Sequence, residues 1–318
     1  AIVFEGSDSS FSTLTANAVD GVEVNANLTT TTGALSLDGD SDNAVDTLSG
    51  NDYILFASGT TLTSAGNITL SAANGGMTTA GNLTLSAPSS ITMTGTMSGT
   101  GDISLSASNG ITLNNSISTS SGLLSINANS SALTLGSGVT LSSTNALTLA
   151  ASSTTSSGDL TLTSSASTIN VNNALVSAGA VTMTASTGLT LSNSTLTGSG
   201  NISLQGGSSL SLASGTTITS SAGNITLGAS GGSITANGAL TLSSNGSITV
   251  SNALTATGAA TLNANSGITL GNSFTANGAV ALDADLDNNG TGDFTISSGT
   301  LSTTSNALTL TANDLTLA

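Results

Sequence analysis

The chain contains no Lys, Arg, His, Cys or Trp, and its 318 residues carry a formal net charge of −16. Fourteen Asp residues and two Glu residues, Glu5 and Glu23, supply that charge. Because no side chain can neutralise a phosphate, we expect the protein to bind neither nucleic acid nor an anionic membrane surface. The absence of cysteine also excludes a disulfide framework and thiolate chemistry.

Groups that could carry out catalysis are equally scarce. Without His, Cys or Lys the chain lacks the usual nucleophiles and general bases, and without Arg it cannot clamp an anionic substrate. Paired Asp carboxylates could still serve a glycosidase. A sugar site usually adds aromatic platforms, however, and aromatic residues make up only 2 % of the chain. We therefore expect no enzymatic activity and keep an Asp-based polysaccharide hydrolase as a remote alternative.

Long apolar runs are also missing. No run approaches the ~18 to 20 residues that a membrane-spanning helix needs, so we expect no transmembrane segment. No basic stretch followed by an apolar one opens the chain, which fits a mature form or an excerpt of a longer protein. Aliphatic residues nevertheless recur at regular spacing, and this regularity argues against a disordered chain.

A short segment recurs along most of the sequence. It reads G-N-I-T-L at Gly66–Leu70, and most of its copies begin 20 to 23 residues apart. A short strand repeated at a period of roughly 20 residues is typical of a solenoid, in which each turn covers the hydrophobic face of the next. Further copies begin at Gly81, Gly101, Gly158, Gly179, Gly200, Gly223, Gly238, Gly258 and Gly278.

Within each copy the apolar residues alternate with polar ones. Ile68 and Leu70 would point to one face of a strand, and Asn67 and Thr69 to the other. Gly and Asn punctuate the joins between strands, where positive φ angles are needed. We predict an all-β fold with almost no helix: a parallel β-helix (β-solenoid) of about 20 residues per coil. The crossover rule makes right-handed coils the expectation.

The sequence also contains a second repeat, which is longer than one coil. Residues 65–116 reappear in edited form as residues 222–273, close to half the chain further on. We therefore expect one continuous solenoid in three parts. They are an irregular N-terminal region at 1–65 that could form a cap or an assembly surface, a first module at 66–222, and a partial second copy at 223–318. The second copy stops partway, which fits either an uncapped end or a slice of a longer chain.

Two clusters of acidic residues follow matching strands, at 33–37 and 278–282. Alternating carboxylates before a tight turn suit Ca²⁺, which prefers six to eight oxygen ligands. Residues 285–293 also follow the first nine positions of an EF-hand loop, although Ile296 replaces the bidentate Glu. We predict possible Ca²⁺ ligands in both clusters, and the alternative is a solvated acidic loop. The predicted ligands are Asp38, Asp40, Asp42 and Asp46 (with Asp52 nearby), and Asp283, Asp285, Asp287, Asn289 and Asp293.

Two surface patterns have simpler explanations. The outward Thr columns could order water as in ice-binding proteins, but they mix with Ser, Asn and Ala, so a polar solvated sheet is the better interpretation. The N-x-[ST] sequons, such as those at Asn67 and Asn224, fall where the strand pattern itself requires Thr or Ser. We interpret them as a by-product of composition.

The repeats G-[NDA]-[ILV]-[TS]-L and S-x-x-G-x-[IL]-T-L resemble those of large bacterial surface proteins of the filamentous-haemagglutinin type. The resemblance covers roughly Gly33 to the end of the sequence. It implies export, a right-handed parallel β-helix, and a role as a long adhesin or surface fibre. The present sequence differs in lacking basic residues, and the resemblance assigns no functional residue.

Three hypotheses for function follow. The first is a non-enzymatic subunit of an extracellular fibre, sheath or surface layer, whose partners are copies of itself stacked head to tail or side by side. The second is an adhesin stalk or binding module on the cell surface, with glycans or a host surface as partner. The third is the Asp-based hydrolase. The first two place the protein outside the cell or at its surface.

Overall fold

Residues 1–44, 52–192 and 195–317 are described by a computed structural model of the chain. These residues form 43 β-strands and no helix, which confirms the predicted all-β class. The described part accordingly contains no helix that could cross a membrane. The chain divides into two compact units, Ala1–Ser156 and Ser157–Ala318, and each is described by itself below.

The first unit consists of seven turns, and each turn contributes one strand to each of three parallel sheets. Sheet A contains β1 (Ile2–Phe4), β4 (Val22–Val24), β7 (Tyr53–Phe56), β10 (Gly76–Thr79), β13 (Met97–Gly99), β16 (Ile117–Thr119) and β19 (Val139–Ser143). Sheet B contains β2 (Ser9–Phe11), β5 (Leu28–Thr30), β8 (Thr60–Thr63), β11 (Leu83–Ala87), β14 (Ile103–Ala107), β17 (Leu124–Asn127) and β20 (Leu147–Ala150). Sheet C contains β3 (Leu14–Asn17), β6 (Leu35–Asp38), β9 (Ile68–Ser71), β12 (Ile91–Thr94), β15 (Ile111–Leu113), β18 (Ala132–Leu135) and β21 (Ser153–Ser156).

The second unit repeats this arrangement with sheets that we name A′, B′ and C′. Sheet A′ contains β22 (Leu160–Ser164), β25 (Val181–Ala185), β28 (Ile202–Gly206), β31 (Ile225–Ala229), β34 (Ile248–Val250), β37 (Ile268–Leu270), β40 (Phe294–Ile296) and β43 (Leu315–Leu317). Sheet B′ contains β23 (Ile169–Val171), β26 (Gly188–Leu191), β29 (Ser209–Leu212), β32 (Ser233–Ala236), β35 (Leu254–Ala256), β38 (Phe274–Ala276) and β41 (Leu301–Ser302). Sheet C′ contains β24 (Ala174–Ser177), β27 (Thr195–Gly198), β30 (Thr216–Ser220), β33 (Leu240–Ser244), β36 (Ala260–Ala264), β39 (Val280–Asp283) and β42 (Leu308–Thr311).

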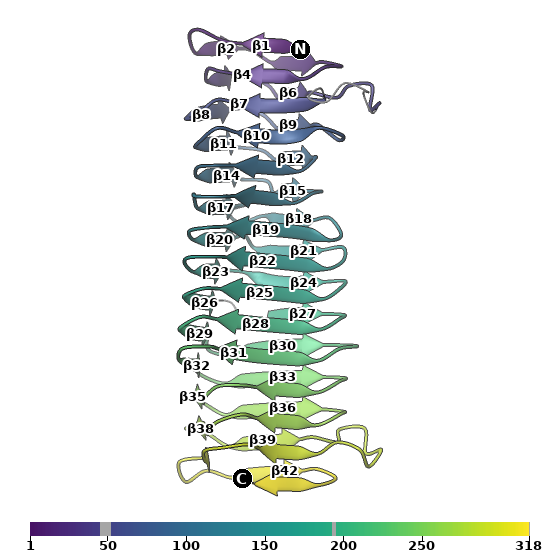
Figure 1. The fold of residues 1–318 in the computed structure, drawn as a ribbon, viewed down its shortest axis with the longest axis vertical. Coiled ribbons are helices and arrows are strands. Elements are labelled where there is room, and N and C mark those ends of the chain that lie inside the picture. Colours follow the sequence, from purple (N-terminus) through teal and green to yellow (C-terminus); the bar gives the residue numbers. More distant parts are fainter. Residues whose placement is uncertain (45–51, 193–194, 318) are drawn as a thin grey trace. The chain divides into compact units, whose positions relative to one another are not determined.

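Successive turns stack in register within each unit, as Figure 1 shows for the strands of each sheet. In sheet C, Ile91 pairs with Ile111 of the next turn. In sheet A, Ile117 pairs with Leu141, so this turn is slightly longer than the one between Ile91 and Ile111. The predicted β-solenoid and its period of about 20 residues are therefore confirmed, and its handedness stays a prediction.

The core of each unit consists of aliphatic rungs, because inward and outward positions alternate along every strand. In β14 the inward side chains of Ile103, Leu105 and Ala107 are buried, and the serines between them are half-buried. Burying one such Leu or Ile contributes about 1.5–3 kcal/mol. Three phenylalanines, Phe56, Phe274 and Phe294, are fully buried among the aliphatic rungs.

The G-N-I-T-L signature occupies different corners of the turn, which its period alone does not reveal. Gly66 precedes β9 in sheet C, whereas Gly81 precedes β11 in sheet B of the same unit. At several corners a buried hydroxyl at the end of a strand donates to a glycine carbonyl. Thr79 Oγ1, for example, donates to the Gly81 carbonyl at 2.9 Å. The true repeat is therefore a single strand with its corner, three of which complete one turn.

The N-terminal region contains the strands β1 to β8 despite its irregular sequence. Ile2 and Phe4 of β1 pair with Val22 and Val24 of β4, in the same register as later turns. The rings of Phe4 and Phe11 meet edge to face, with centroids 6.4 Å apart. Whether these turns form a cap or an assembly surface, and where the sequence modules begin and end, stays a prediction.

Candidate functional site

The first acidic cluster forms a tight turn at the end of β6. Asp38 is the last residue of the strand, and its Oδ1 accepts a hydrogen bond from the Asp40 amide at 3.1 Å. Position 39 requires glycine, because a Cβ there would lie only 2.1 Å from the Tyr53 carbonyl oxygen. Asn43 then adopts a φ of 51°, and its amide donates to the Asp40 carbonyl at 3.2 Å. Asn tolerates this left-handed conformation better than most residues.

Asp40 is fully buried at the centre of this turn. Its Oδ2 accepts hydrogen bonds from the backbone amide of Asn74 at 3.0 Å and from the Asn74 side-chain amide at 2.9 Å. Its Oδ1 is buried and has no hydrogen-bond partner among the described residues. Asp42 is exposed, and its Oδ1 accepts from the Ala44 amide at 3.2 Å. The cluster is therefore an organised turn built around one buried carboxylate.

The second acidic cluster begins in the same way at the end of β39. Asp283 Oδ1 accepts from the Asp285 amide at 3.3 Å. Asn288 has a φ of 52°, and its amide donates to the Asp285 carbonyl at 2.9 Å. Asp285, which is 8 % exposed, accepts from the amides of Asn289 and Gly290 at 3.0 Å each, one on each carboxylate oxygen. This turn therefore satisfies its buried carboxylate with its own backbone.

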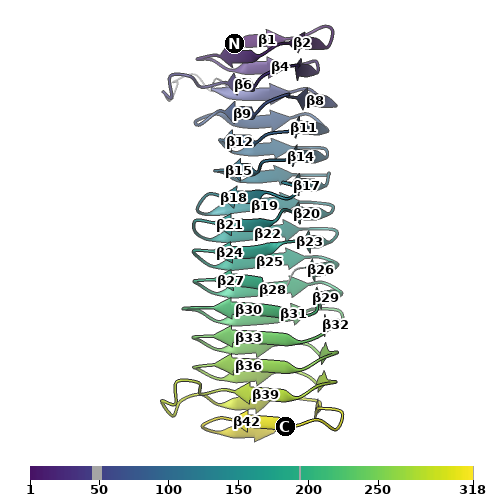
Figure 2. The ribbon, with the colours of Figure 1, turned by 180° about the vertical axis from the view of Figure 1, so that it is seen from behind.

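The outer residues of the second cluster point in different directions. Asp287 is exposed, and its Oδ2 accepts from the Asn289 side-chain amide at 2.9 Å. Asp293 Oδ1 instead accepts from the backbone amide of Asp314 in the following turn, at 3.2 Å. The loop extends sideways beyond neighbouring turns of its unit (Figure 2). Its carboxylates therefore serve several separate hydrogen bonds.

These arrangements bear on the predicted Ca²⁺ sites. The structure brings Asp38 next to Asp40, and Asp283 next to Asp285. Within the described residues, no three acidic side chains are grouped so that they could share one metal ion. Asp46 lies outside the described residues. Calcium binding by either cluster stays a prediction.

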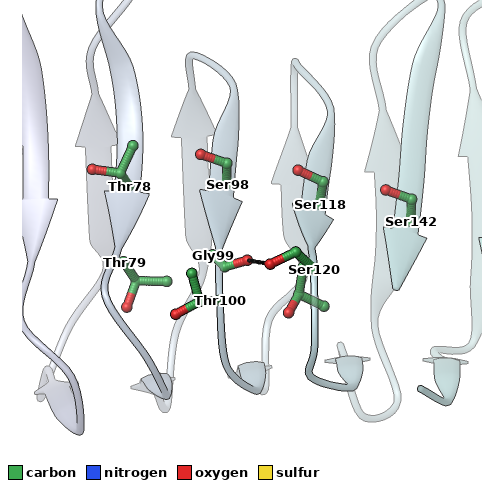
Figure 3. Close-up of a pocket in the computed structure, with 9 residues that line it drawn as sticks. Thr78, Thr79, Ser98, Gly99, Thr100, Ser118, Ser120 and Ser142 are labelled. Atoms are coloured by element: carbon green, nitrogen blue, oxygen red, sulfur yellow. Dashed lines mark hydrogen bonds between the residues drawn. The ribbon is translucent and has the colours of Figure 1, made fainter. Parts of the chain in front are cut away.

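A shallow groove of about 580 Å³ runs over four turns of sheet A in the first unit. Figure 3 shows Thr78, Ser98, Ser118 and Ser142 side by side in a row, one on each of β10, β13, β16 and β19. These four residues are register partners in adjacent strands, so their hydroxyls follow the strand spacing of about 4.8 Å. The groove is also lined by Thr79, Gly99, Thr100, Thr119 and Ser120.

Two of the groove residues are structural. Thr79 and Thr119 are almost fully buried, at 3 % and 4 % exposure, and their hydroxyls bind the glycine carbonyls of the corner. The groove therefore offers hydroxyl and methyl groups and carries no charged side chain. Chemically it suits a neutral, polar ligand or a layer of water.

Tyr53 is the only tyrosine in the chain, and it lies beside the first acidic turn. Its hydroxyl donates a hydrogen bond to Glu23 Oε1 at 2.8 Å. This hydrogen bond, together with burial and the negative charge of Glu23, raises the pKa of Tyr53 above its ordinary value. Since an ionised phenolate would face a carboxylate, the pair is stable only with the phenol protonated.

The Asn and Asp residues of the repeat signature have a structural role that sequence reasoning missed. Asn201 Oδ1 accepts from the Asn224 amide at 2.8 Å, and Asn224 Oδ1 accepts from the Ser247 amide in the next turn, also at 2.8 Å. In the first unit, Asn82 Oδ1 accepts in the same way from the Asp102 amide at 2.9 Å. We call these bonds the inter-turn ladder. The signal was present in the sequence as Asn or Asp directly after the corner glycine.

Comparison with protein families agrees with this architecture. Haemagglutinin repeats match residues 7–72, 114–182 and 176–229, which together cover more than half of the chain. The chain belongs to the haemagglutinin repeat family. The resemblance inferred from the G-N-I-T-L repeats is thereby confirmed.

A second family, described as repeats of unknown function, matches residues 58–127 and 230–297 of this haemagglutinin repeat chain. Comparison with curated proteins and with solved structures finds no significant match. The haemagglutinin repeat family and the β-solenoid fold together indicate a surface adhesin-like or structural repeat protein that is secreted or surface-exposed.

Proposed function

We propose that this chain is a non-enzymatic structural segment of an extracellular fibre, sheath or surface layer, and that its copies associate end to end. The haemagglutinin repeats and the uniform rungs of each unit support a structural role. So does the composition, because the chain has no His, Cys, Lys or Arg to activate a substrate. The observation that carries the end-to-end contact is an apolar groove on the last turn of the second unit.

This groove has a volume of about 430 Å³ and lies between β40, β41, β42 and β43, of which the last three are the final described strands of their sheets. Leu315 and Leu317 of β43 are 53 % and 67 % exposed. One turn earlier, their register partners Phe294 and Ile296 are buried. The groove is lined by Phe294, Ile296, Gly299, Leu301, Leu308, Leu310, Leu315 and Leu317.

A second copy of the chain offers a surface of matching chemistry. On the first turn of the first unit, Ile2, Phe4, Phe11 and Leu14 are only partly buried, and β1, β2 and β3 form sheet edges. Exposed parallel edges can hydrogen-bond to another strand. Docking this turn onto β43 would add a rung like those inside each unit, and burial would contribute about 1.5–3 kcal/mol per fully covered Leu.

Electron microscopy of the purified chain in negative stain tests this proposal. We expect filaments that lengthen with protein concentration, and we expect the double variant Leu315→Asp/Leu317→Asp to abolish them. Val176→Asp is the matched control, because Val176 is 46 % exposed but lies on the outer face of β24. Dispersed particles at every concentration, or filaments that persist in the double variant, contradict the proposal.

An adhesin stalk is the second candidate, and the groove along Thr78, Ser98, Ser118 and Ser142 is the observation that favours it. Its uncharged hydroxyl lining suits a neutral glycan chain. A glycan array probed with this chain distinguishes the two functions. Binding that disappears in a Ser98→Leu/Ser118→Leu variant, while filaments persist, favours the adhesin role. An array without any signal removes it.

A further inference from the structure

We propose that the first acidic turn holds a hard divalent cation of the Ca²⁺ type, and that Asp40 anchors it through Oδ1. The proposal does not depend on the structural role proposed above. It starts from the buried Oδ1 of Asp40, which has no hydrogen-bond partner in the part of the chain that the structure describes. A buried carboxylate with an unsatisfied oxygen costs several kcal/mol unless a cation or a proton compensates it.

The second acidic turn provides an internal comparison. Asp40 and Asp285 occupy equivalent places, since each binds back to the Asp at its strand end and each precedes a left-handed Asn by three residues. In the second turn, the amide of Asn289 reaches Asp285 Oδ1. In the first turn, the equivalent amide of Ala44 donates instead to Asp42 Oδ1. That diversion leaves Asp40 Oδ1 without the partner that Asp285 has.

Within the described residues no group compensates this carboxylate oxygen. A second acidic residue, Asp52, is only 5 % exposed, and its backbone carbonyl accepts from the Gly75 amide at 3.1 Å. Asp40 binds the adjacent residue, Asn74, so both acidic residues lie against the same Asn74–Gly75 turn. The chain contains no Lys, Arg or His that could neutralise either of them. A bound cation would supply the missing partner and leave both Asn74 hydrogen bonds in place.

The nature of the ion follows from the ligands. Carboxylate and carbonyl oxygens suit Ca²⁺, which takes six to eight oxygen ligands and accepts water among them. Because no third acidic side chain joins the described part of the turn, we expect modest affinity. About 10⁻⁴–10⁻³ M is typical of extracellular calcium modules. Asp285, with both oxygens satisfied, is expected to need no ion.

Terbium luminescence tests the site, because Tb³⁺ replaces Ca²⁺ and is excited through a nearby tyrosine. Tyr53 is the only tyrosine, there is no Trp, and its carbonyl lies directly against Gly39. Ions bound at the second acidic turn have no such sensitiser in their unit. We expect Tyr-sensitised Tb³⁺ emission that Ca²⁺ displaces. Asp40→Asn should weaken Tb³⁺ binding by more than the roughly 10–100-fold that loss of an outer-shell partner costs, whereas Asp285→Asn should leave it unchanged.

Calorimetric titration of the wild-type chain with CaCl₂ keeps the test decisive if Asp40→Asn does not fold. We expect the wild-type chain to bind one Ca²⁺. The Tyr53→Phe variant should bind the same number of Ca²⁺ ions and lose only the sensitised Tb³⁺ luminescence. The absence of Ca²⁺-displaceable emission in the wild type overturns the proposal. So does equal loss of binding in Asp285→Asn. A wild-type melting temperature that Ca²⁺ does not raise also overturns it, because an ion that binds only the folded chain must stabilise it.

Discussion

Replacing one inward Leu and its outward neighbour tests how the strands face the core. Leu105 of β14 is fully buried and pairs with Leu85 and Ile126 in the adjacent turns of sheet B. Leu105→Ala removes a buried isobutyl group and leaves a cavity between three rungs. Substitutions of this kind cost about 2.7–5.0 kcal/mol, and the upper part of that range applies where neighbours cannot collapse. Paired strands on both sides restrict such collapse here.

The control is Ser104→Ala, one residue earlier in the same strand. Ser104 is half-buried on the outer face, and we expect its replacement to change stability by less than about 0.5 kcal/mol. Urea unfolding followed by circular dichroism measures both variants. Hydrogen exchange with pepsin digestion locates the loss. Equal effects at the two positions would refute the assigned register, since a slip of one residue exchanges inward and outward faces.

Three further predictions concern the corners and the tyrosine. Asn201→Ala removes the acceptor for the Asn224 amide and should cost about 0.5–1.5 kcal/mol in urea unfolding, whereas Asn201→Asp keeps the acceptor and should cost less. At Gly95 the φ angle is 110°, and a Cβ would lie 2.2 Å from the Ala72 carbonyl oxygen. Gly95→Ala should therefore lower the melting temperature more than Gly6→Ala, because Gly6 has a φ of 89° but no atom within 4 Å of such a Cβ. Equal shifts in melting temperature would show that the contact at Gly95 is relieved. Because the pKa of Tyr53 is raised in the folded state, the stability from its Glu23 hydrogen bond should be present below pH ~10 and lost as pH rises above it. Ultraviolet titration should place tyrosinate formation higher in the wild type than in Glu23→Gln, and identical midpoints would contradict the pairing.

The sequence specified the strands well because their pattern is local. Ile68 and Leu70 alternate with polar residues, and both side chains are buried in β9 as expected. The three-strand turn was less accessible. Gly66 and Gly81 carry the same signature but stand at different corners, and only the stacking of distant turns decides which corner each one takes.

The candidate site shows the same limit. The turns that begin at Asp38 and Asp283 could be predicted from alternating acids and Asn or Gly. The burial of Asp40 could not, since it depends on Asn74, which lies 34 residues away. The inter-turn ladder could not be predicted from the sequence for a related reason. An Asn such as Asn224 looks like a surface sequon until the next turn places the Ser247 amide against its side chain.

Sedimentation velocity over a wide concentration series tests the proposed end-to-end association most directly. A head-to-tail contact between unlike ends adds copies without limit when its rotation does not close a ring. The account predicts a sedimentation coefficient that rises continuously with concentration in the wild type and stays constant in Leu315→Asp/Leu317→Asp. A wild-type chain that remains a single species, or that stops at a closed dimer, would contradict it.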